Sequence, residues 1–371
     1  MVYGLDKPRK NKAPRVILLA LAVIAVIAAV LYFSGAVGGR GRDTNAIKLR
    51  CVAGQKVTPF GNSVLYYDGT TLFCLNASGG EKWSYTLGSN AGFNCEGGTL
   101  VAWVGNQLFV FDENGRSTYN DHLSEGTVQF AKAGTKYVAA VVGSGIGPTL
   151  IVKDLEGINV LEEQTAYMDA IVLDAGFFGG GEYLWTTSLD VYGTVPETTL
   201  YTRQVGKWSS GAVSLGDSLC YAVRYSGNRL NVMTTRHLLV YDYRGTQDKS
   251  ATMLLYGWQL VDWTESRSAA ELLFAPSWQS EEGHYMTELR LIQGTKDTRI
   301  TLPTRCVGAA LFRSRIYAFG EDAIFRAGYR DTRFTPFSLP MNRPVTEFFG
   351  ILSGGSALLA CGNDVYLVTL R

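Results

Sequence analysis

A short pattern returns along the chain and constrains its fold more than any other feature. In each copy an alternating apolar run ends in Asn or Asp, a glycine follows three residues later, and a second run comes after it. Four clear copies lie at 71–83, 107–115, 149–157 and 237–245. The Asn or Asp side chain bonds the backbone ahead of it, and the glycine takes the left-handed position. Each copy therefore predicts two strands joined by a tight hairpin.

Weaker copies extend the pattern to the C-terminus. The apolar residue at the second position of each copy recurs every 35 to 51 residues, at Leu72, Leu108, Leu150, Leu200, Leu238, Leu289, Ile324 and Val365. A hairpin repeat of this length is typical of an all-β protein, a β-propeller of four-stranded blades in which each anchored run is the third strand. Eight anchors predict eight blades, and the weakness of the copies at Leu289 and Ile324 leaves seven as the alternative.

The two ends of the repeat predict how the ring closes. The last anchored run has no fourth strand after it, whereas a spare strand-like run, 46–52, precedes the first complete blade. We expect this N-terminal strand to pair with the last anchored run, so that no edge stays unpaired. The same closure puts Cys51 and Cys361 in one blade and makes them the candidate disulfide. The apolar runs around most of the six cysteines favour buried thiols instead.

The first copy also carries a family resemblance. Residues 72–85, with Asn76, Gly79 and Trp83, resemble the PQQ-like (quinoprotein-type) propeller repeat. Tyr119 and Leu161 stand at the Trp83 position in the next two copies. Quinoprotein dehydrogenases hold their cofactor with a vicinal disulfide, and no two cysteines are adjacent here. The resemblance therefore implies a scaffold without a cofactor. Residues 15–371 also look like membrane-anchored propellers of unknown function from Gram-positive bacteria, which implies no activity.

The N-terminal segment predicts a single membrane-spanning helix. Residues 16–33 are uncharged and almost wholly apolar, and as a helix they would be about 27 Å long, close to a bilayer's hydrocarbon core. Five cations precede them in the tail 1–15, and a Gly-rich tether, 34–45, follows. The positive-inside rule places the N-terminus in the cytoplasm and the propeller, 46–371, outside the cell membrane. A cleaved signal peptide is the competing interpretation.

Residue types exclude several function classes. The part of the chain after the tether is mildly acidic, at about −4, so no basic stripe is available for nucleic acid. No nucleophile elbow, zinc-protease motif or phosphate loop occurs, and the three histidines lie far apart in sequence. We expect no catalytic residues, no metal and no cofactor.

Some residues of the expected inner strands would face a central channel, where propeller glycosidases place paired carboxylates. The channel candidates are Asp169, Asp174, Trp258, Asp262, Trp263 and Glu265. A working pair would have its carboxyl groups roughly 5–10 Å apart. These residues carry the alternative hypothesis, a cell-envelope carbohydrate-active enzyme.

The longest insertions predict a binding face. Residues 189–198 and 276–285 both fall between the second and third strands of a blade, and such loops share one face of the ring. The partner-binding candidates on them are Tyr192, Trp278, His284 and Tyr285. The leading hypothesis is a non-enzymatic scaffold, tethered to the membrane by one helix, that binds a protein or a cell-envelope polymer outside the cytoplasm. A sensor is a weaker alternative because the cytoplasmic tail is too short to form a domain.

Overall fold

The computed structural model describes residues 45–370, apart from 124–125, 145–146, 208–209, 243, 267–268, 278–284 and 331–332. The basic tail, the expected membrane helix 16–33 and the tether up to residue 44 lie outside the described residues. Within the described part of the chain, no helix is long and apolar enough to cross a bilayer. The strands all belong to one compact unit, Ala46–Arg371.

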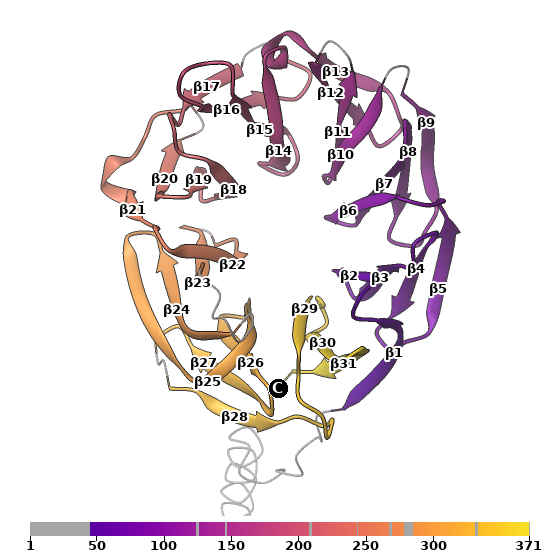
Figure 1. The fold of residues 1–371 in the computed structure, drawn as a ribbon, viewed down its shortest axis with the longest axis vertical. Coiled ribbons are helices and arrows are strands. Elements are labelled where there is room, and N and C mark those ends of the chain that lie inside the picture. Colours follow the sequence, from indigo (N-terminus) through magenta and orange to yellow (C-terminus); the bar gives the residue numbers. More distant parts are fainter. Residues whose placement is uncertain are drawn as a thin grey trace, which may run out of the picture. The chain divides into compact units, whose positions relative to one another are not determined.

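Seven antiparallel sheets follow one another along the chain, and six of them have four strands each. Figure 1 shows them arranged radially around a common centre. The first three are β2 (Lys56–Phe60), β3 (Ser63–Tyr67), β4 (Thr71–Asn76) and β5 (Glu81–Thr86); β6 (Gly92–Glu96), β7 (Thr99–Val104), β8 (Gln107–Asp112) and β9 (Ser117–His122); and β10 (Thr127–Ala133), β11 (Tyr137–Ser144), β12 (Gly147–Asp154) and β13 (Asn159–Glu163). We call these sheets blades one to three.

Two more four-stranded sheets continue the ring as blades four and five. Blade four follows a short 3-10 helix, η1 (Thr165–Tyr167), and blade five contains a second one, η2 (Lys249–Ala251). Their strands are β14 (Ala170–Phe178), β15 (Tyr183–Asp190), β16 (Glu197–Gln204) and β17 (Ser210–Ser214); and β18 (Cys220–Ser226), β19 (Arg229–Thr234), β20 (His237–Asp242) and β21 (Met253–Leu254).

The next sheet has seven strands because two four-stranded units share its longest strand, β25 (Lys296–Phe312). Residues 296–301 of β25 pair with β24, and residues 306–312 pair with β26. We call the two units blades six and seven. Their other strands are β22 (Trp258–Thr264), β23 (Glu271–Pro276) and β24 (Met286–Gln293); and β26 (Arg315–Gly320), β27 (Ala323–Gly328) and β28 (Thr335–Ser338).

The last sheet joins the two ends of the described chain. Its strand order is β1 (Ala46–Val52), β31 (Asp364–Thr369), β30 (Ser356–Cys361) and β29 (Glu347–Ile351). The predicted closure by the N-terminal strand is confirmed, since Ala46 pairs with Val368 and Lys48 with Tyr366. A salt bridge of 2.9 Å between Lys48 Nζ and Asp364 Oδ1 lies across the same strand pair. We call this sheet blade eight.

The core is divided among the gaps between blades. Eight hydrophobic clusters occur in the described residues, and each draws side chains from two neighbouring units. The all-β prediction is confirmed, and all eight sequence anchors lie on third strands, β4, β8, β12, β16, β20, β24, β27 and β31. The sheets number seven, whereas strand pairing and core clusters both give eight four-stranded units.

The candidate disulfide between Cys51 and Cys361 does not form. Both are buried free thiols, as are Cys74, Cys220 and Cys306, and Cys95 is a half-buried one. Cys51 packs in the cluster between blades eight and one, whereas Cys361 packs in the cluster between blades seven and eight. Their strands β1 and β30 are separated by β31, which puts the backbones about 10 Å apart, beyond disulfide reach.

Candidate functional site in the central cavity

In seven of the blades the first strand lies nearest the centre of the ring, namely β2, β6, β10, β14, β18, β22 and β29 (Figure 1), and several of these inner strands carry a bulge. In β14 the register shifts between Val172 and Asp174, and in β22 it shifts between Leu260 and Asp262. Asp174 and Asp262 are therefore equivalent residues, each directly after a bulge. In both, Oδ1 accepts a hydrogen bond from the next backbone N–H, at 2.9 and 2.8 Å. Bulges of this kind re-aim side chains.

Charges of alternating sign occupy six consecutive inner strands. From β2 to β22 the charged residues are Lys56, Glu96, Lys132, Asp174, Arg224 and Asp262. Neighbouring charges of opposite sign favour each other's ionised forms, which offsets part of the cost of holding them away from bulk water.

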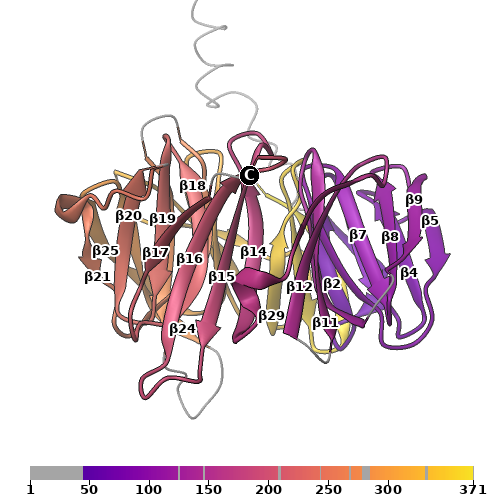
Figure 2. The same ribbon diagram turned by 90° about the horizontal axis from the view of Figure 1, so that it is seen from above.

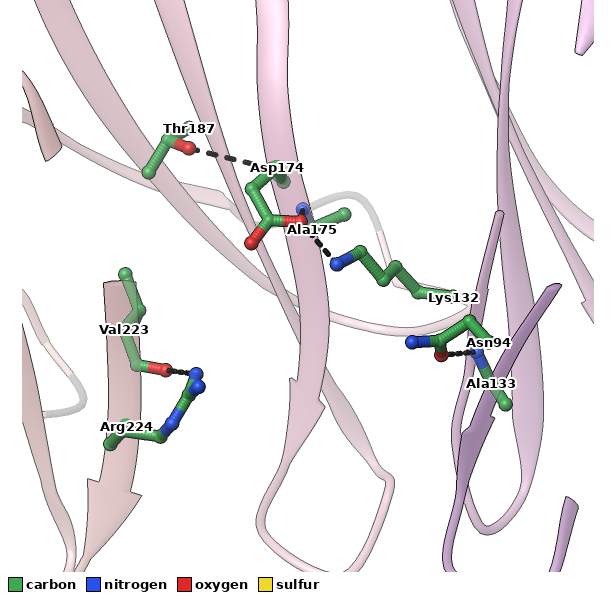
Figure 3. Close-up of polar contacts among 8 residues, drawn as sticks. All are labelled: Asn94, Lys132, Ala133, Asp174, Ala175, Thr187, Val223 and Arg224. Carbon is green, nitrogen blue, oxygen red and sulfur yellow. Dashed lines mark hydrogen bonds and ion pairs between the residues drawn. The ribbon is translucent and has the colours of Figure 1, made fainter. Parts of the chain in front are cut away.

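The closest pair in this series is Lys132 with Asp174, whose Nζ and Oδ1 are 2.7 Å apart across blades three and four. Figure 3 shows the two side chains meeting between their strands. Beside them, Asn94 Oδ1 of blade two accepts a hydrogen bond from the Ala133 backbone N–H at 2.9 Å. These contacts fix the inner edges of three blades to one another.

Arg224 on β18 is held differently. Its Nη1 donates to its neighbour's carbonyl, Val223 O, at 2.8 Å, and its buried Nε has no hydrogen-bond partner. The guanidinium carbon lies 5.5 Å from the centre of the Trp263 ring, within cation–π range. Burial lowers the pKa of Arg224, and the charges of Asp174, Glu96 and Asp262 oppose that shift. The side chain is thus a partly buried cation near several carboxylates, with no ion pair to any described residue.

Asp262 acts as a brace between two blades. Its Oδ2 accepts a hydrogen bond of 2.7 Å from the backbone N–H of Leu311 on β25, in addition to the bond from Trp263. Burial raises its pKa, and the two backbone hydrogen bonds work against that rise. Because both carboxylate oxygens already hold backbone N–H groups, Asp262 has a structural role in joining blades six and seven.

Four of the six charged residues, Glu96, Lys132, Asp174 and Arg224, line a cavity of about 550 Å³ that opens to solvent. Its polar lining includes Asn94, Glu96, Lys132, Asp174, Arg224 and Glu265. Its aromatic lining includes Phe177, Phe178, Trp185, Tyr225 and Trp263. Glu96 is open to the cavity, yet the surrounding protein raises its pKa by desolvation, against the lowering effect of Arg224 and Lys132.

The structure brings three of the six channel candidates into this cavity, namely Asp174, Trp263 and Glu265. Asp169 instead lines a separate depression of about 250 Å³ with Asp190 and Glu197. Trp258 is buried in the core between blades five and six, where the guanidinium groups of Arg290 and Arg299 lie 5.8 and 5.5 Å from its ring.

Sequence reasoning missed three residues of the cavity, Glu96, Lys132 and Arg224. A search for paired carboxylates could not find the two cations. A signal was present, because each of the three is the one charged residue of its inner strand, β6, β10 or β18. No group of three or more His, Cys, Asp or Glu side chains that could hold a metal ion occurs among the described residues.

The two described loop candidates, Tyr192 and Tyr285, do not line the cavity. Tyr192, between β15 and β16, leaves 79% of its surface exposed, and its backbone N–H donates to Asp190 Oδ1 at 2.9 Å. Tyr285, just before β24, is half-buried and hydrogen-bonds Glu321, which raises the tyrosine pKa. Trp278 and His284 lie outside the described residues.

Comparison with known proteins identifies the architecture. No family model matches the sequence, and no curated protein matches it. Among solved structures, a prolyl endopeptidase aligns with a TM-score of 0.51 at 14% identity, over 94% of this chain and 60% of that one. A eukaryotic initiation factor aligns with a TM-score of 0.50 at 10% identity, over 77% and 88%. The WD40 domain of Neurospora crassa Pan2 aligns with a TM-score of 0.49 at 9% identity, over 86% and 90%. At these identities the likeness extends to the fold alone, and the radial arrangement of the sheets of this chain is that of a β-propeller.

Proposed function

We propose that this protein is a non-enzymatic scaffold that binds a protein or a cell-envelope polymer through one face of its propeller. The observation that carries the proposal is a concentration of exposed apolar side chains on blade four. Of the ten large hydrophobic residues that stand exposed in the described chain, five belong to the start of this blade and to its β15–β16 loop, namely Met168, Ile171, Val191, Tyr192 and Val195. We call these five residues the blade-four patch.

Topology extends the patch along one face. Loops between second and third strands share a face of the ring with the connections between blades. Leu219, in the connection to blade five, and Leu254 and Tyr256, near the connection to blade six, are also exposed. Figure 2 shows the β15–β16 hairpin extending beyond the neighbouring loops. Contiguous exposed apolar residues are typical of binding surfaces.

Acidic groups border the apolar residues. Asp169, Asp190 and Glu197 line the depression beside Met168, within the same end of blade four. An apolar surface edged with carboxylates fits a partner segment that combines apolar and basic residues. A protein supplies that combination more readily than a neutral polymer does.

The test is cross-linking in cells that express the full chain. We expect the variant with Tyr192→Ser and Val195→Ser to lose a discrete cross-linked product that the native chain forms. Ile158→Ser is the matched control, because Ile158 is about as exposed as Val195 but lies in a β12–β13 turn on the opposite face. Digestion of the product with protease or with a glycan hydrolase identifies its class. Equal capture by all three proteins would end the proposal.

Membrane tethering is part of this proposal and rests on the sequence of residues 16–33. Their length, their lack of charge and the five cations before them support one helix with the propeller outside the membrane. The PQQ-like repeat type likewise rests on residues 72–85.

The membrane orientation can be tested with protease. Protease added to intact cells should degrade the propeller of the native chain. Protection of the propeller until the cells are lysed would contradict the orientation.

One observation favours the alternative, a carbohydrate-active enzyme. A glycosidase needs one carboxyl group that keeps its proton, and burial raises the pKa of Glu96 in the same cavity as Asp174 and Glu265. Against it, Asp174 is neutralised by Lys132. Hydrolysis of envelope glycan strands that is lost in both Glu96→Gln and Asp174→Asn would support the enzyme, and absence of hydrolysis by the native protein would exclude it.

A further inference from the structure

The hydrogen-bonding capacity of Arg224 in the central cavity is largely unused. Of its five N–H donors, one is directed to the Val223 carbonyl, and the buried Nε has no acceptor in the described structure. The two terminal nitrogens, Nη1 and Nη2, form an edge that can hold a carboxylate with two parallel hydrogen bonds. In Figure 3 no interaction joins this guanidinium to Asp174, whose carboxylate is held by Lys132. Arg224 lines the cavity and is only partly buried, so its terminal Nη1–Nη2 edge is left to bind a ligand there.

Two carboxylates in the same cavity are also unpaired. Neither Glu96 nor Glu265 forms a salt bridge with a described residue, and both line the cavity with Arg224. With Lys132 and Asp174 neutralising each other, one cation and two anions remain. A simple anion would be attracted by Arg224 and repelled by the two glutamates. A simple cation would be attracted by the glutamates and repelled by Arg224. A molecule that carries both charges satisfies both kinds of group.

The remaining wall of the cavity is aromatic. Trp263 lies against Arg224, and Phe177 and Tyr225 stand half-buried in the lining. The volume of about 550 Å³ lies within the range of small-molecule sites. We propose that the central cavity binds a small zwitterion, an α-amino acid or a short peptide. Its carboxylate lies on the terminal Nη1–Nη2 edge of Arg224, its ammonium group meets Glu96, and its side chain packs on the aromatic wall. This site is separate from the blade-four patch and does not depend on the scaffold proposal.

The test compares four probes by equilibrium dialysis against the purified full chain in detergent. L-phenylalanine carries both charges, 3-phenylpropionate lacks the ammonium group and 2-phenylethylamine lacks the carboxylate. The dipeptide Gly-Phe has both charges in a longer molecule. We expect phenylalanine or Gly-Phe to bind at least about tenfold more tightly than either half-molecule, which corresponds to one well-placed charged contact. The tighter of these two probes tells whether the site takes a single amino acid or a peptide.

Variants then assign the two ends of the ligand. Arg224→Lys keeps the charge but loses the fork, so we expect about a tenfold loss for phenylalanine and 3-phenylpropionate and no loss for 2-phenylethylamine. Glu96→Gln should weaken phenylalanine and 2-phenylethylamine and spare 3-phenylpropionate. The matched control is Arg229→Lys, since Arg229 is an exposed arginine of the same blade, paired with Asp248 at 2.6 Å outside the cavity.

Three results would overturn the proposal. One is that none of the probes is retained at concentrations up to about 1 mM, the weak limit of specific small-ligand binding. Another is that a half-molecule binds as tightly as both zwitterions. The third is that Arg224→Lys and Glu96→Gln, folded as judged by circular dichroism, bind every probe like the native chain. Because Glu96 is open to solvent, its variant remains informative even where Arg224→Lys fails to fold.

Discussion

The indole of Trp83 lies against the backbone of Gly115, in the turn of the next blade. A Cβ atom added to Gly115 would come within 2.4 Å of Trp83 Cγ, and the indole Nε1 donates to Glu113 O at 3.4 Å. The same relationship recurs between Tyr119 and Gly157. The two parts of the sequence repeat, an outer-strand side chain and a turn glycine, thus meet between consecutive blades rather than within one.

This contact predicts the effect of Gly115→Ala. Gly115 has φ of +76°, so alanine brings backbone strain as well as a clash with Trp83. We expect the free energy of unfolding to fall by about 2–4 kcal/mol, as for a strained residue combined with overpacking. The matched control is Gly105→Ala in the same blade, where φ is +58° but nothing lies within 4 Å of the added Cβ. Urea unfolding should show a smaller loss of stability for Gly105→Ala. Equal losses for the two variants would mean that the contact between Trp83 and Gly115 does not contribute to stability.

The period of the repeat explains which parts of this fold the sequence predicts and which it does not. Each copy has an apolar run on a third strand even where the turn residues differ from the pattern. The third strands that contain Leu289 and Ile324 could therefore be predicted from weak copies. Trp83 could be recognised as part of the motif, but its partner Gly115 lies 32 residues away in the next copy. Pairings between blades depend on the tilt and spacing of whole sheets, which a linear pattern does not contain.

The pairing of β1 with β31 leads to a prediction about a chain that lacks β1. A chain that starts at residue 53 leaves the edge of β31 unpaired and exposes part of the core between blades eight and one. We expect it to aggregate, whereas a chain that starts at residue 45 should elute as a single species and unfold cooperatively. Size-exclusion chromatography and calorimetry of the two chains measure this. Identical behaviour would mean that β1 does not close the ring.

The cysteines predict insensitivity to reducing agents. Burial raises the pKa of Cys51 to about 11 and that of Cys306 to about 12, so both thiols stay protonated and unreactive near neutral pH. We expect six thiols to titrate in guanidinium without reductant, far fewer in the native protein, and no change of the unfolding midpoint with dithiothreitol. Four titratable thiols in guanidinium would instead indicate one disulfide.

Asp262 and Asp174 look alike in sequence but predict different mutational effects. Asp262→Asn places an NH₂ group against the N–H of Leu311 or Trp263, and we expect a loss of about 1–3 kcal/mol of stability from the unsatisfied donor. Asp174→Asn removes one partly exposed ion pair and should cost less than about 1 kcal/mol. Chemical denaturation of the two variants compares them. A larger loss for Asp174→Asn would reverse the assigned roles.

The limits of sequence reasoning are clearest at this cavity. Asp174 and Glu265 could be proposed for the channel because they stand at the ends of expected inner strands. The strand pattern did not place Asp169 in the inter-blade connection or Trp258 in the core, because one residue of register decides which way a side chain points. The bulges before Asp174 and Asp262 are such one-residue events. The role of Arg224 and Lys132 in the cavity depends on the carboxylates that the closed ring brings near them.

Glu96 predicts how stability depends on pH. Desolvation by the surrounding protein raises its pKa above the usual 4.5, so between pH 4.5 and that higher pKa the folded protein holds a proton that the unfolded chain has released. The free energy of unfolding contributed by this group therefore falls as pH rises through that window, and the penalty remains at higher pH. Glu96→Gln removes the titration. We expect the variant to match the native protein near pH 4 and to exceed its stability near pH 7. Urea unfolding at both pH values measures the difference between the two proteins, which cancels the contribution of Asp262, whose pKa is also raised. If the stability difference between the two proteins is the same at both pH values, Arg224 and Lys132 balance the desolvation of Glu96. If it is larger near pH 4, they outweigh it. Either result would contradict the prediction.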